Sequence, residues 1–286
     1  MSERLVCAWA PHHITAFFKP VVKPGDPTGS GSIGAGLVVG PEARVCIGRG
    51  SNPKLEPLRT VIETIVGSSD VLVEHLDPLP FERGYASSAA GAIAGALASA
   101  VYKGYPMTRA LRVAHIAEVI HRTGLGDVLA ITGAPYGGIA VRVEAGPPGY
   151  GIVEAIPLPL SLGILSIEGK PMSTRELLSR YDERYENSAM RALNKLLDDM
   201  TAETFVEEAT RHTIDTGVAK FVLGESGVEL VSKAPGLIGF YAKKSVVVLL
   251  VERDRITDAV DYIERALGLR ARVLEAYTQG LTVKVL

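Results

Sequence analysis

The most informative part of this 286-residue sequence is Pro80-Phe81-Glu82-Arg83-Gly84-Tyr85-Ala86-Ser87-Ser88-Ala89-Ala90. In it, a loop with a single glycine runs straight into an alanine-rich segment, which is expected to be helical from Ser87 to about Lys103. The N-terminus of a helix presents free amide donors and a partial positive charge, and both favour phosphate groups. The hydroxyl groups of Ser87 and Ser88 can meet phosphate oxygens or Mg²⁺; in the simpler alternative, Ser87 only caps the helix.

A second helix, with polar residues on one face, is expected after this one. Thr108 is a candidate N-cap, and the helix would run to His121 or Arg122. His115 and Glu118 are three residues apart, so their side chains share a face beside a stripe of small residues. A glutamate beside such a stripe is often simply solvated, and this alternative stays open.

Asp127 follows that helix in the loop Gly124-Leu125-Gly126-Asp127. An aspartate in a glycine-rich loop is often only a turn former. Here it comes third in an order of chemically useful residues, after Ser87-Ser88 and Glu118 and before Gly137-Gly138. This order favours a phosphate site with two carboxylates over an ordinary turn.

Glycine is the outlier of the composition, with 30 residues that gather mainly at 25–50 and 124–151. Such clusters mark places where the backbone turns sharply or approaches a ligand, although ordinary hairpin turns use glycine too. The first cluster contains Gly29-Ser30-Gly31-Ser32-Ile33-Gly34, which matches the GxGxxG of dinucleotide-binding folds. That motif needs a strand before it and a helix after it, whereas here a loop precedes it and the strand-like Leu37–Val39 follows. A dinucleotide site is therefore not expected.

The bulk composition excludes several classes of protein. Apolar residues make up 47% and charged residues 22% of the chain, as in soluble globular proteins, and the net charge of −2 gives no basic footprint for nucleic acid. Cys7 and Cys46 are too few for a disulfide framework and have no zinc-site spacing. No secretory signal is evident, and the longest weakly apolar run, Ser88–Val101, is too short to span a bilayer. We therefore expect a cytoplasmic protein.

The hydrophobic pattern predicts a mixed α and β organisation in two halves. Strands are expected in the first half at Leu5–Ala8, Ile14–Phe18, Leu37–Val39 and Arg44–Ile47. The Pro- and Gly-rich segment 145–163 is typical of a seam, which divides the chain into domains 1–155 and 156–286. In the second half, Ser173–Glu176 is a capping-box pattern. The chain ends in a strand, a helix and two strands, at Val246–Val251, Ile256–Leu267, Ala271–Ala276 and Leu281–Val285, which suits a ferredoxin-like α+β half.

The motifs together resemble those of the GHMP kinase superfamily. The stretch 80–90 is similar to its phosphate loop, and Gly124–Val128 with Gly137-Gly138 resembles the segment that carries its catalytic aspartate. Ala10–Phe18 and Thr28–Gly36 are similar to motifs of the archaeal pantoate kinases within it. The resemblance covers roughly residues 5–180. It implies an α+β fold, with a first half like domain 2 of ribosomal protein S5 and a ferredoxin-like second half.

This resemblance also implies a reaction and a set of site residues. The expected function is transfer of a phosphoryl group from ATP to the primary hydroxyl of pantoate, giving 4-phosphopantoate for coenzyme A synthesis. ATP would be held by Gly84, Ser87, Ser88, Ala89 and Glu118. Mg²⁺ would be held by Ser88 and Glu118, and Asp127 would accept the proton of the hydroxyl. The substrate would be bound by Ser32, His115, Arg142 and Thr174, with Arg142 as the partner of its carboxylate.

The sequence departs from the superfamily pattern at three places. Tyr85-Ala86 replaces the usual Leu-Gly of the phosphate loop. His12-His13 stands where other members carry Gly-Lys or Gly-Arg, so that segment supplies no cation. The third, glycine-rich motif is weak, and Pro235–Gly239 is its nearest candidate.

Two alternatives of different kinds stay open at this point. One is another kinase of the superfamily, with homoserine or a mevalonate-type alcohol as substrate. The other is a non-catalytic protein that binds a nucleotide or metabolite, although such a protein would not need the base Asp127. In either case the partner is a small molecule, with no nucleic acid and no membrane, and a homodimer is left open.

Overall fold

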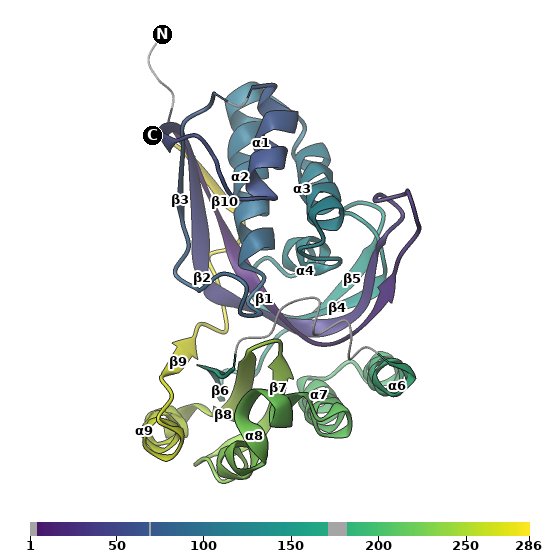
Figure 1. The fold of residues 1–286 in the computed structure, drawn as a ribbon, viewed down its shortest axis with the longest axis vertical. Helices are drawn as coiled ribbons and strands as arrows, with labels where there is room; N and C mark the ends of the chain where they lie inside the picture. Colours follow the sequence, from purple (N-terminus) through teal and green to yellow (C-terminus); the bar gives the residue numbers. More distant parts are fainter. Residues whose placement is uncertain (1–4, 69, 171–181) are drawn as a thin grey trace.

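The computed structural model describes residues 5–68, 70–170 and 182–286, which form two layers (Figure 1). The upper layer consists of β1 (Val6–Val21), β2 (Gly31–Ser51), α1 (Leu58–Val66), β3 (Val73–Leu76), α2 (Ser87–Lys103), α3 (Met107–His121), α4 (Asp127–Gly133), β4 (Gly138–Glu144), β5 (Ile152–Ile156) and β10 (Thr282–Val285). The lower layer consists of β6 (Leu162–Glu168), α6 (Glu183–Asp198), α7 (Ala202–Thr216), α8 (Val218–Val231), β7 (Leu237–Lys243), β8 (Val246–Glu252), the 3₁₀ turn Arg253–Arg255, α9 (Ile256–Leu267) and β9 (Ala271–Leu274). The α+β class predicted from the sequence is confirmed.

The upper sheet is built on one long antiparallel hairpin of β1 and β2. The strand order is β10-β1-β2-β4-β5, with β3 paired to β2. The four short strands expected from the sequence are parts of this hairpin, whose register shifts between Ala10 and His12 and between Thr15 and Phe17. The prediction split the strands because β1 is buried on both faces over most of its length, so it lacks the alternation that marks a half-buried strand.

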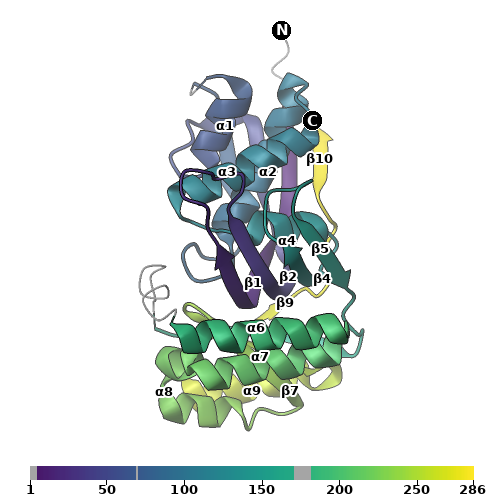
Figure 2. The ribbon, with the colours of Figure 1, turned by 90° about the vertical axis from the view of Figure 1, so that its right-hand side faces the viewer.

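Helices α1 to α4 pack on one face of this sheet and enclose a core with the first part of β1. The alanine-rich α2 begins and ends where the sequence predicts, and it is buried on nearly all sides. The expected cap of α3 is wrong, because Pro106 and not Thr108 precedes its first turn. The opposite face of the sheet packs on α6 and α7, which lie side by side (Figure 2), through aromatic residues such as Phe17 and Phe205.

The lower sheet has the order β7-β8-β6-β9, which is the ferredoxin-like arrangement of a β-α-β-β-α-β unit. Helix α7 covers the open edge at β7, where Thr210 and Thr213 accept hydrogen bonds from the backbone N–H groups of Phe240 and Ala242, at 3.0 and 3.2 Å. Helices α8 and α9 pack on the far face. Ser173–Glu176, the predicted capping box, lies outside the described residues.

The end of the chain departs from the expected ferredoxin-like ending in one respect. Strand β9 belongs to the lower sheet, but β10 returns to the upper sheet and pairs with β1 from Val6 to Trp9. The chain therefore passes twice between the layers, and the domain division at residue 155 stays a prediction.

Two further features concern the sequence predictions. Cys7 and Cys46 lie opposite each other on β1 and β2 and form a disulfide bond, which the count of two cysteines, 39 residues apart, did not reveal. Among the residues that the structure describes, no helix is both long and apolar enough to cross a membrane.

Candidate active site

Asp127 is the first residue of α4, and it follows the loop of Gly124-Leu125-Gly126 and contacts β1 of the upper sheet. Its Oδ1 lies 2.7 Å from Nδ1 of His13 on β1, and its side chain keeps 20% of its surface exposed. Burial alone would raise the pKa of Asp127. The hydrogen bond from His13, and the charges of Lys243 and Arg142, reverse this and hold the pKa well below its usual range. The carboxylate is therefore charged at neutral pH.

His13 connects Asp127 to Arg142 on β4. Nη1 of Arg142 lies 3.3 Å from Nε2 of His13, and Nε of Arg142 donates to the carbonyl of Ser32 at 3.3 Å. Burial lowers the pKa of His13 to about 4, although Asp127 acts in the opposite direction. Burial also lowers the pKa of Arg142 to about 10, so the guanidinium remains a cation. Arg142 was predicted from the sequence, whereas His13 was not, because the superfamily pattern indicates a cation at that position.

Glu118 on α3 supplies the second carboxylate of the site. Its Oε1 accepts a hydrogen bond from Thr123 at 2.8 Å, whereas its buried Oε2 has no hydrogen-bond partner among the described residues. Burial, followed by the negative charge of Asp127, raises the pKa of Glu118 to about 7, while contacts with Thr123 and Ser88 act against the rise. The alternative of a solvated glutamate is wrong, since Glu118 is 2% exposed.

The two carboxylates meet at Gly124. A Cβ atom at this position would lie 2.2 Å from Oε2 of Glu118 and 2.9 Å from Oδ2 of Asp127. Only glycine leaves room for both oxygens there.

The start of α2 is the part of the chain where the sequence predicts a phosphate loop. Ala86, with a positive φ of 56°, is the N-cap, so the alternative that Ser87 merely caps the helix is wrong. The Ser87 hydroxyl instead points back to the carbonyls of Leu79 and Pro80, at 3.5 and 3.4 Å. Ser88 and Ala89 follow in the first turn.

Tyr85, one of the departures from the superfamily pattern, ties this loop to the lower sheet. Its ring is buried, and its hydroxyl donates to Oγ of Ser166 on β6 at 3.0 Å. A leucine could not make this bond.

The turn between β7 and β8 meets the same loop and was missed by the sequence analysis. The backbone N–H of Ser245 donates to the carbonyl of Arg83 at 3.1 Å. Gly84 has a φ of 126°, and a Cβ there would lie 2.5 Å from the carbonyl of Lys243. Pro235–Gly239, the candidate for the third motif, is at the opposite end of β7, where Gly236 packs on Arg255.

Two lysines in this turn add positive charge near the carboxylates. Burial lowers the pKa of Lys243 to about 7, although the charge of Asp127 opposes the shift. Burial also lowers the pKa of Lys244, against the charges of Asp127 and Glu118. The adjacent lysines before a β-branched strand are a sequence signal that could have found this turn.

The remaining predicted residues have varied positions. Ser32 is buried, and its Oγ would lie 2.3 Å from a Cβ at Gly126, so it borders the Asp127 loop. Nε2 of His115 donates to the carbonyl of Ser30 at 2.9 Å and thus holds the end of the loop that precedes β2. Thr174 lies outside the described residues.

The donors fit Mg²⁺ as a metal shared with phosphates. No group of three or more His, Cys, Asp or Glu side chains suited to a metal ion occurs in the described part of the chain. Mg²⁺ commonly takes one or two carboxylates together with water and substrate phosphates. The unpartnered oxygen of Glu118, with Ser88 beside it, meets that requirement.

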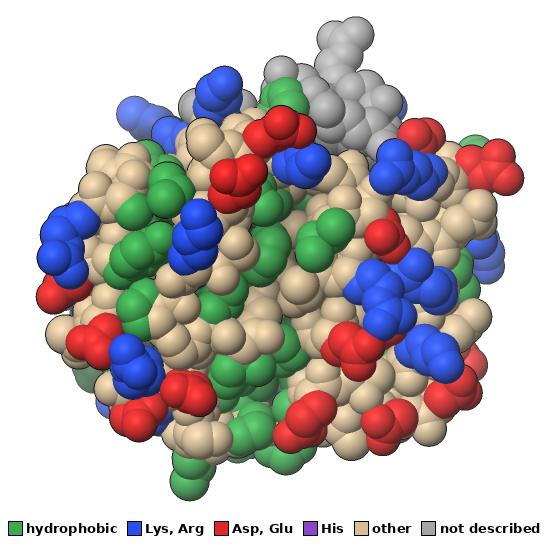
Figure 3. All heavy atoms as spheres, turned by 90° about the horizontal axis from the view of Figure 1, so that it is seen from below, with side chains coloured by type: hydrophobic (Ala, Val, Ile, Leu, Met, Phe, Trp, Pro, Cys, Tyr) green, Lys and Arg blue, Asp and Glu red, His purple; other side chains and the backbone are tan. Residues whose placement is uncertain are grey.

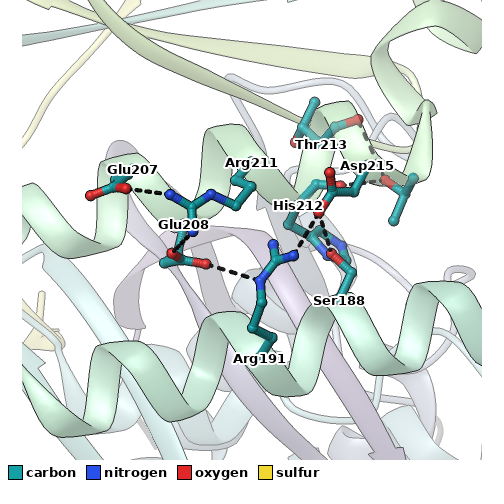
Figure 4. Close-up of polar contacts among 9 residues, drawn as sticks. Ser188, Arg191, Glu207, Glu208, Arg211, His212, Thr213 and Asp215 are labelled. Atoms are coloured by element: carbon teal, nitrogen blue, oxygen red, sulfur yellow. Dashed lines mark hydrogen bonds and ion pairs between the residues drawn. The ribbon is translucent and has the colours of Figure 1, made fainter.

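A second polar cluster joins α6 to α7, and none of its labelled residues is a predicted site residue (Figure 4). Arg191 contacts Glu208 and Asp215, at 3.5 and 2.8 Å, and His212 bonds Ser188 at 3.1 Å. These contacts hold the two helices together.

The lower face of the molecule carries a band of hydrophobic side chains between charged groups (Figure 3). A surface hollow of about 560 Å³ between α7 and the start of β6 is lined by Val206, Ile214 and Ile238, among others. It contains none of the predicted site residues.

Comparison with known proteins gives relatives over nearly the whole chain. No protein-family model matches. The pantoate kinase of Thermococcus kodakarensis is 30% identical, covering 96% of this chain and 97% of the relative. The pantoate kinase of Methanospirillum hungatei is 32% identical over 64% of this chain and 66% of the relative.

Solved structures agree with the two-layer fold. A phosphotransferase related to the coenzyme A biosynthesis pathway superposes with a TM-score of 0.80 and 27% identity, over 98% of each chain. A homoserine kinase from Cytophaga hutchinsonii superposes with a TM-score of 0.66 at 15% identity, over 99% of this chain and 98% of its own, a likeness that shows the fold alone.

Proposed function

The chain belongs to the GHMP kinase superfamily, and from this premise we propose that it phosphorylates the primary hydroxyl of pantoate with ATP, giving 4-phosphopantoate. The identity to two pantoate kinases supports this substrate. The observation that carries the proposal is the pair of carboxylates at Gly124: a charged, partly exposed Asp127 beside a buried Glu118 with an unpartnered oxygen. Since ATP and coenzyme A synthesis are intracellular, we place the protein in the cytoplasm.

The triphosphate of ATP would lie at the N-terminus of α2, with Gly84, Ser87, Ser88 and Ala89 around it. Free backbone N–H groups and the helix dipole favour phosphate there. Lys243 and Lys244, from the turn that packs on Gly84, would neutralise part of the phosphate charge. Glu118 and Ser88 would hold Mg²⁺, which when bound neutralises charge on the phosphates.

Asp127 would orient the acceptor hydroxyl and take its proton as the new P–O bond forms. Phosphoryl transfer depends mainly on positioning and charge neutralisation, so a carboxylate with a low pKa suffices as acceptor of the proton in the transition state. Oδ1 of Asp127 is occupied by His13, and Oδ2 faces Gly124 next to Glu118. The hydroxyl would thus approach on the side of the carboxylate nearest the proposed metal.

Arg142 would bind the carboxylate of pantoate, with Ser32, His115 and Thr174 completing the contacts. A guanidinium pairs well with a carboxylate through two parallel hydrogen bonds. Lys243 is a second candidate for binding the carboxylate of pantoate. Its side chain is more exposed than that of the buried Arg142, and it is near enough to Asp127 for the two charges to interact.

ADP release in the presence of ATP and Mg²⁺ tests the proposal against its alternatives. The purified protein would be assayed with pantoate, homoserine, mevalonate and phosphomevalonate in turn. We expect stimulation by pantoate alone. Stimulation by homoserine or mevalonate instead would favour another kinase of the superfamily, and ATP binding with no stimulation by any of the four would favour a non-catalytic binding protein.

A further inference from the structure

His13 lies between a group that can only accept hydrogen bonds and a group that can only donate them. The carboxylate of Asp127 is the acceptor, 2.7 Å from Nδ1, and the guanidinium of Arg142 is the donor, 3.3 Å from Nε2. An ionised carboxylate has no proton to give, and a guanidinium has no lone pair to offer. The imidazole ring must therefore donate on one side and accept on the other.

One protonation state of His13 satisfies both neighbours. A neutral ring with its proton on Nδ1 donates to Asp127 and accepts from Arg142. A doubly protonated ring would set its Nε2–H against the N–H of Arg142. The neutral state agrees with the complete burial of His13, which lowers its pKa to about 4.

The resulting chain of hydrogen bonds fixes the carboxylate in one orientation. Oδ1 of Asp127 is held by His13, with the Thr15 hydroxyl more distant at 3.5 Å, and no described residue hydrogen-bonds Oδ2. His13 cannot turn without losing its bond to Arg142, and Arg142 is itself tied to the carbonyl of Ser32.

We propose that His13 is a positioning residue, which holds the carboxylate of Asp127 so that its Oδ2 meets the acceptor hydroxyl, and which is itself held by Arg142. The effect of His13 on catalysis rests on the proposed kinase function. The hydrogen bonds from Arg142 through His13 to Asp127 are present without substrate and do not depend on that function. Loss of an outer residue that orients a functional group commonly lowers activity about 10- to 100-fold. Because Arg142 orients His13, a change at Arg142 acts on the reaction step as well as on substrate binding.

Two variants separate positioning from mere packing. In His13→Asn the side-chain amide can take the place of Nδ1–H and still donate to Asp127, whereas His13→Leu fills the space and donates nothing. We expect kcat to fall about 10- to 100-fold in His13→Leu and to recover most of this loss in His13→Asn, with the KM for ATP changed less than threefold. His212→Leu is the matched control, since His212 is also buried, with a pKa lowered to about 4, but it bonds Ser188 and neither Asp127 nor Arg142.

Carbon-13 NMR of the aspartate carboxyl groups gives a readout that needs no acceptor. Asp127 is faced by His13 and Thr15 on β1, Arg142 on β4, Lys243 and Lys244 in the β7–β8 turn, and Glu118 on α3. Burial raises the pKa of Asp127, and without the bond from His13 only the nearby cations oppose this rise. We therefore expect Asp127 to titrate at higher pH in His13→Leu than in the wild type or in His13→Asn. The signal of Asp127 is assigned by its absence from the spectrum of Asp127→Asn.

The outcomes keep the two hypotheses apart. Equal titration of Asp127 in the wild type and in His13→Leu would overturn the positioning role, as would a loss of kcat in His13→Asn as large as in His13→Leu. A wild-type protein that phosphorylates no acceptor would instead refute the proposed function, and the titration would still decide whether His13 controls the carboxylate.

Discussion

Glu118 and Asp127 direct carboxylate oxygens to the same glycine, Gly124, from two different helices. Burial, and after it the nearby negative charge of Asp127, raises the pKa of Glu118 to about 7, and Oε2 of Glu118 has no hydrogen-bond partner among the described residues. Such an arrangement costs stability in the free protein and is useful only when a positive ligand arrives. This cost supports the proposed Mg²⁺ site at Glu118 over a purely structural contact.

Gly124→Ala should damage the site without unfolding the protein. A methyl group there would overlap both carboxylates, so one of them must move. We expect kcat to fall at least about tenfold, because small misplacements of catalytic groups have large effects. Far-ultraviolet circular dichroism should remain that of the wild type; a variant with wild-type kcat would show that the two oxygens do not act together.

Arg142→Ala should raise the KM for pantoate more than the KM for ATP. The guanidinium is the proposed partner of the substrate carboxylate, and it also supports His13. A drop in kcat should accompany the rise in KM. Steady-state kinetics with each substrate varied in turn measures both. An unchanged KM for pantoate would indicate that another cation, such as Lys243, binds the carboxylate of pantoate.

The charge of Lys243 should make substrate binding depend on pH. Its pKa is lowered to about 7, so the ammonium form is present below that pH and is lost as the pH rises through it. If Lys243 helps to bind an anionic substrate, the KM for that substrate should increase between about pH 7 and 9. In Lys243→Arg, which keeps its charge over this range, the increase should be absent; the same pH dependence in both proteins would exclude this role.

Tyr85→Phe should lower stability, because it removes the bond from the phosphate loop to the lower sheet. The Tyr85 hydroxyl donates to Ser166 at 3.0 Å in a buried place. Loss of one such bond costs about 1 kcal/mol of unfolding free energy. Urea denaturation measures it, and a double-mutant cycle with Ser166→Ala should show that the second substitution adds little to the first; fully additive losses would mean that the two hydroxyls do not interact.

The sequence was informative where the signal was local. The alanine-rich run gave α2 its limits, and the order of Ser88, Glu118 and Asp127 identified residues that the fold brings to one place. The last strand was predicted at Leu281–Val285, but not the sheet to which it belongs, since the pairing of β10 with β1 joins residues from opposite ends of the chain.

Residues that act through distant contacts left no local pattern. His13 and Asp127 are 114 positions apart in the sequence. A histidine in place of the usual lysine or arginine indicated only that a cation was missing, and not that the histidine could orient Asp127. Lys243 depends on the packing of a hairpin turn against Gly84, which only the tertiary structure reveals. Pro235–Gly239 was favoured for its glycines, but these serve the packing of β7 on α7 and Arg255.

A comparison of the wild type with Asp127→Asn, in a reaction of ATP, Mg²⁺ and pantoate, tests both the proposed activity and the role of Asp127. The measurement is phosphorus-31 NMR of the product together with initial rates of ADP release. We predict a phosphate monoester of pantoate with the wild type, and a kcat reduced about 10²- to 10⁴-fold in Asp127→Asn with little change in ATP binding. Absence of the phosphorylated product with the wild type, or undiminished turnover in Asp127→Asn, would contradict the account.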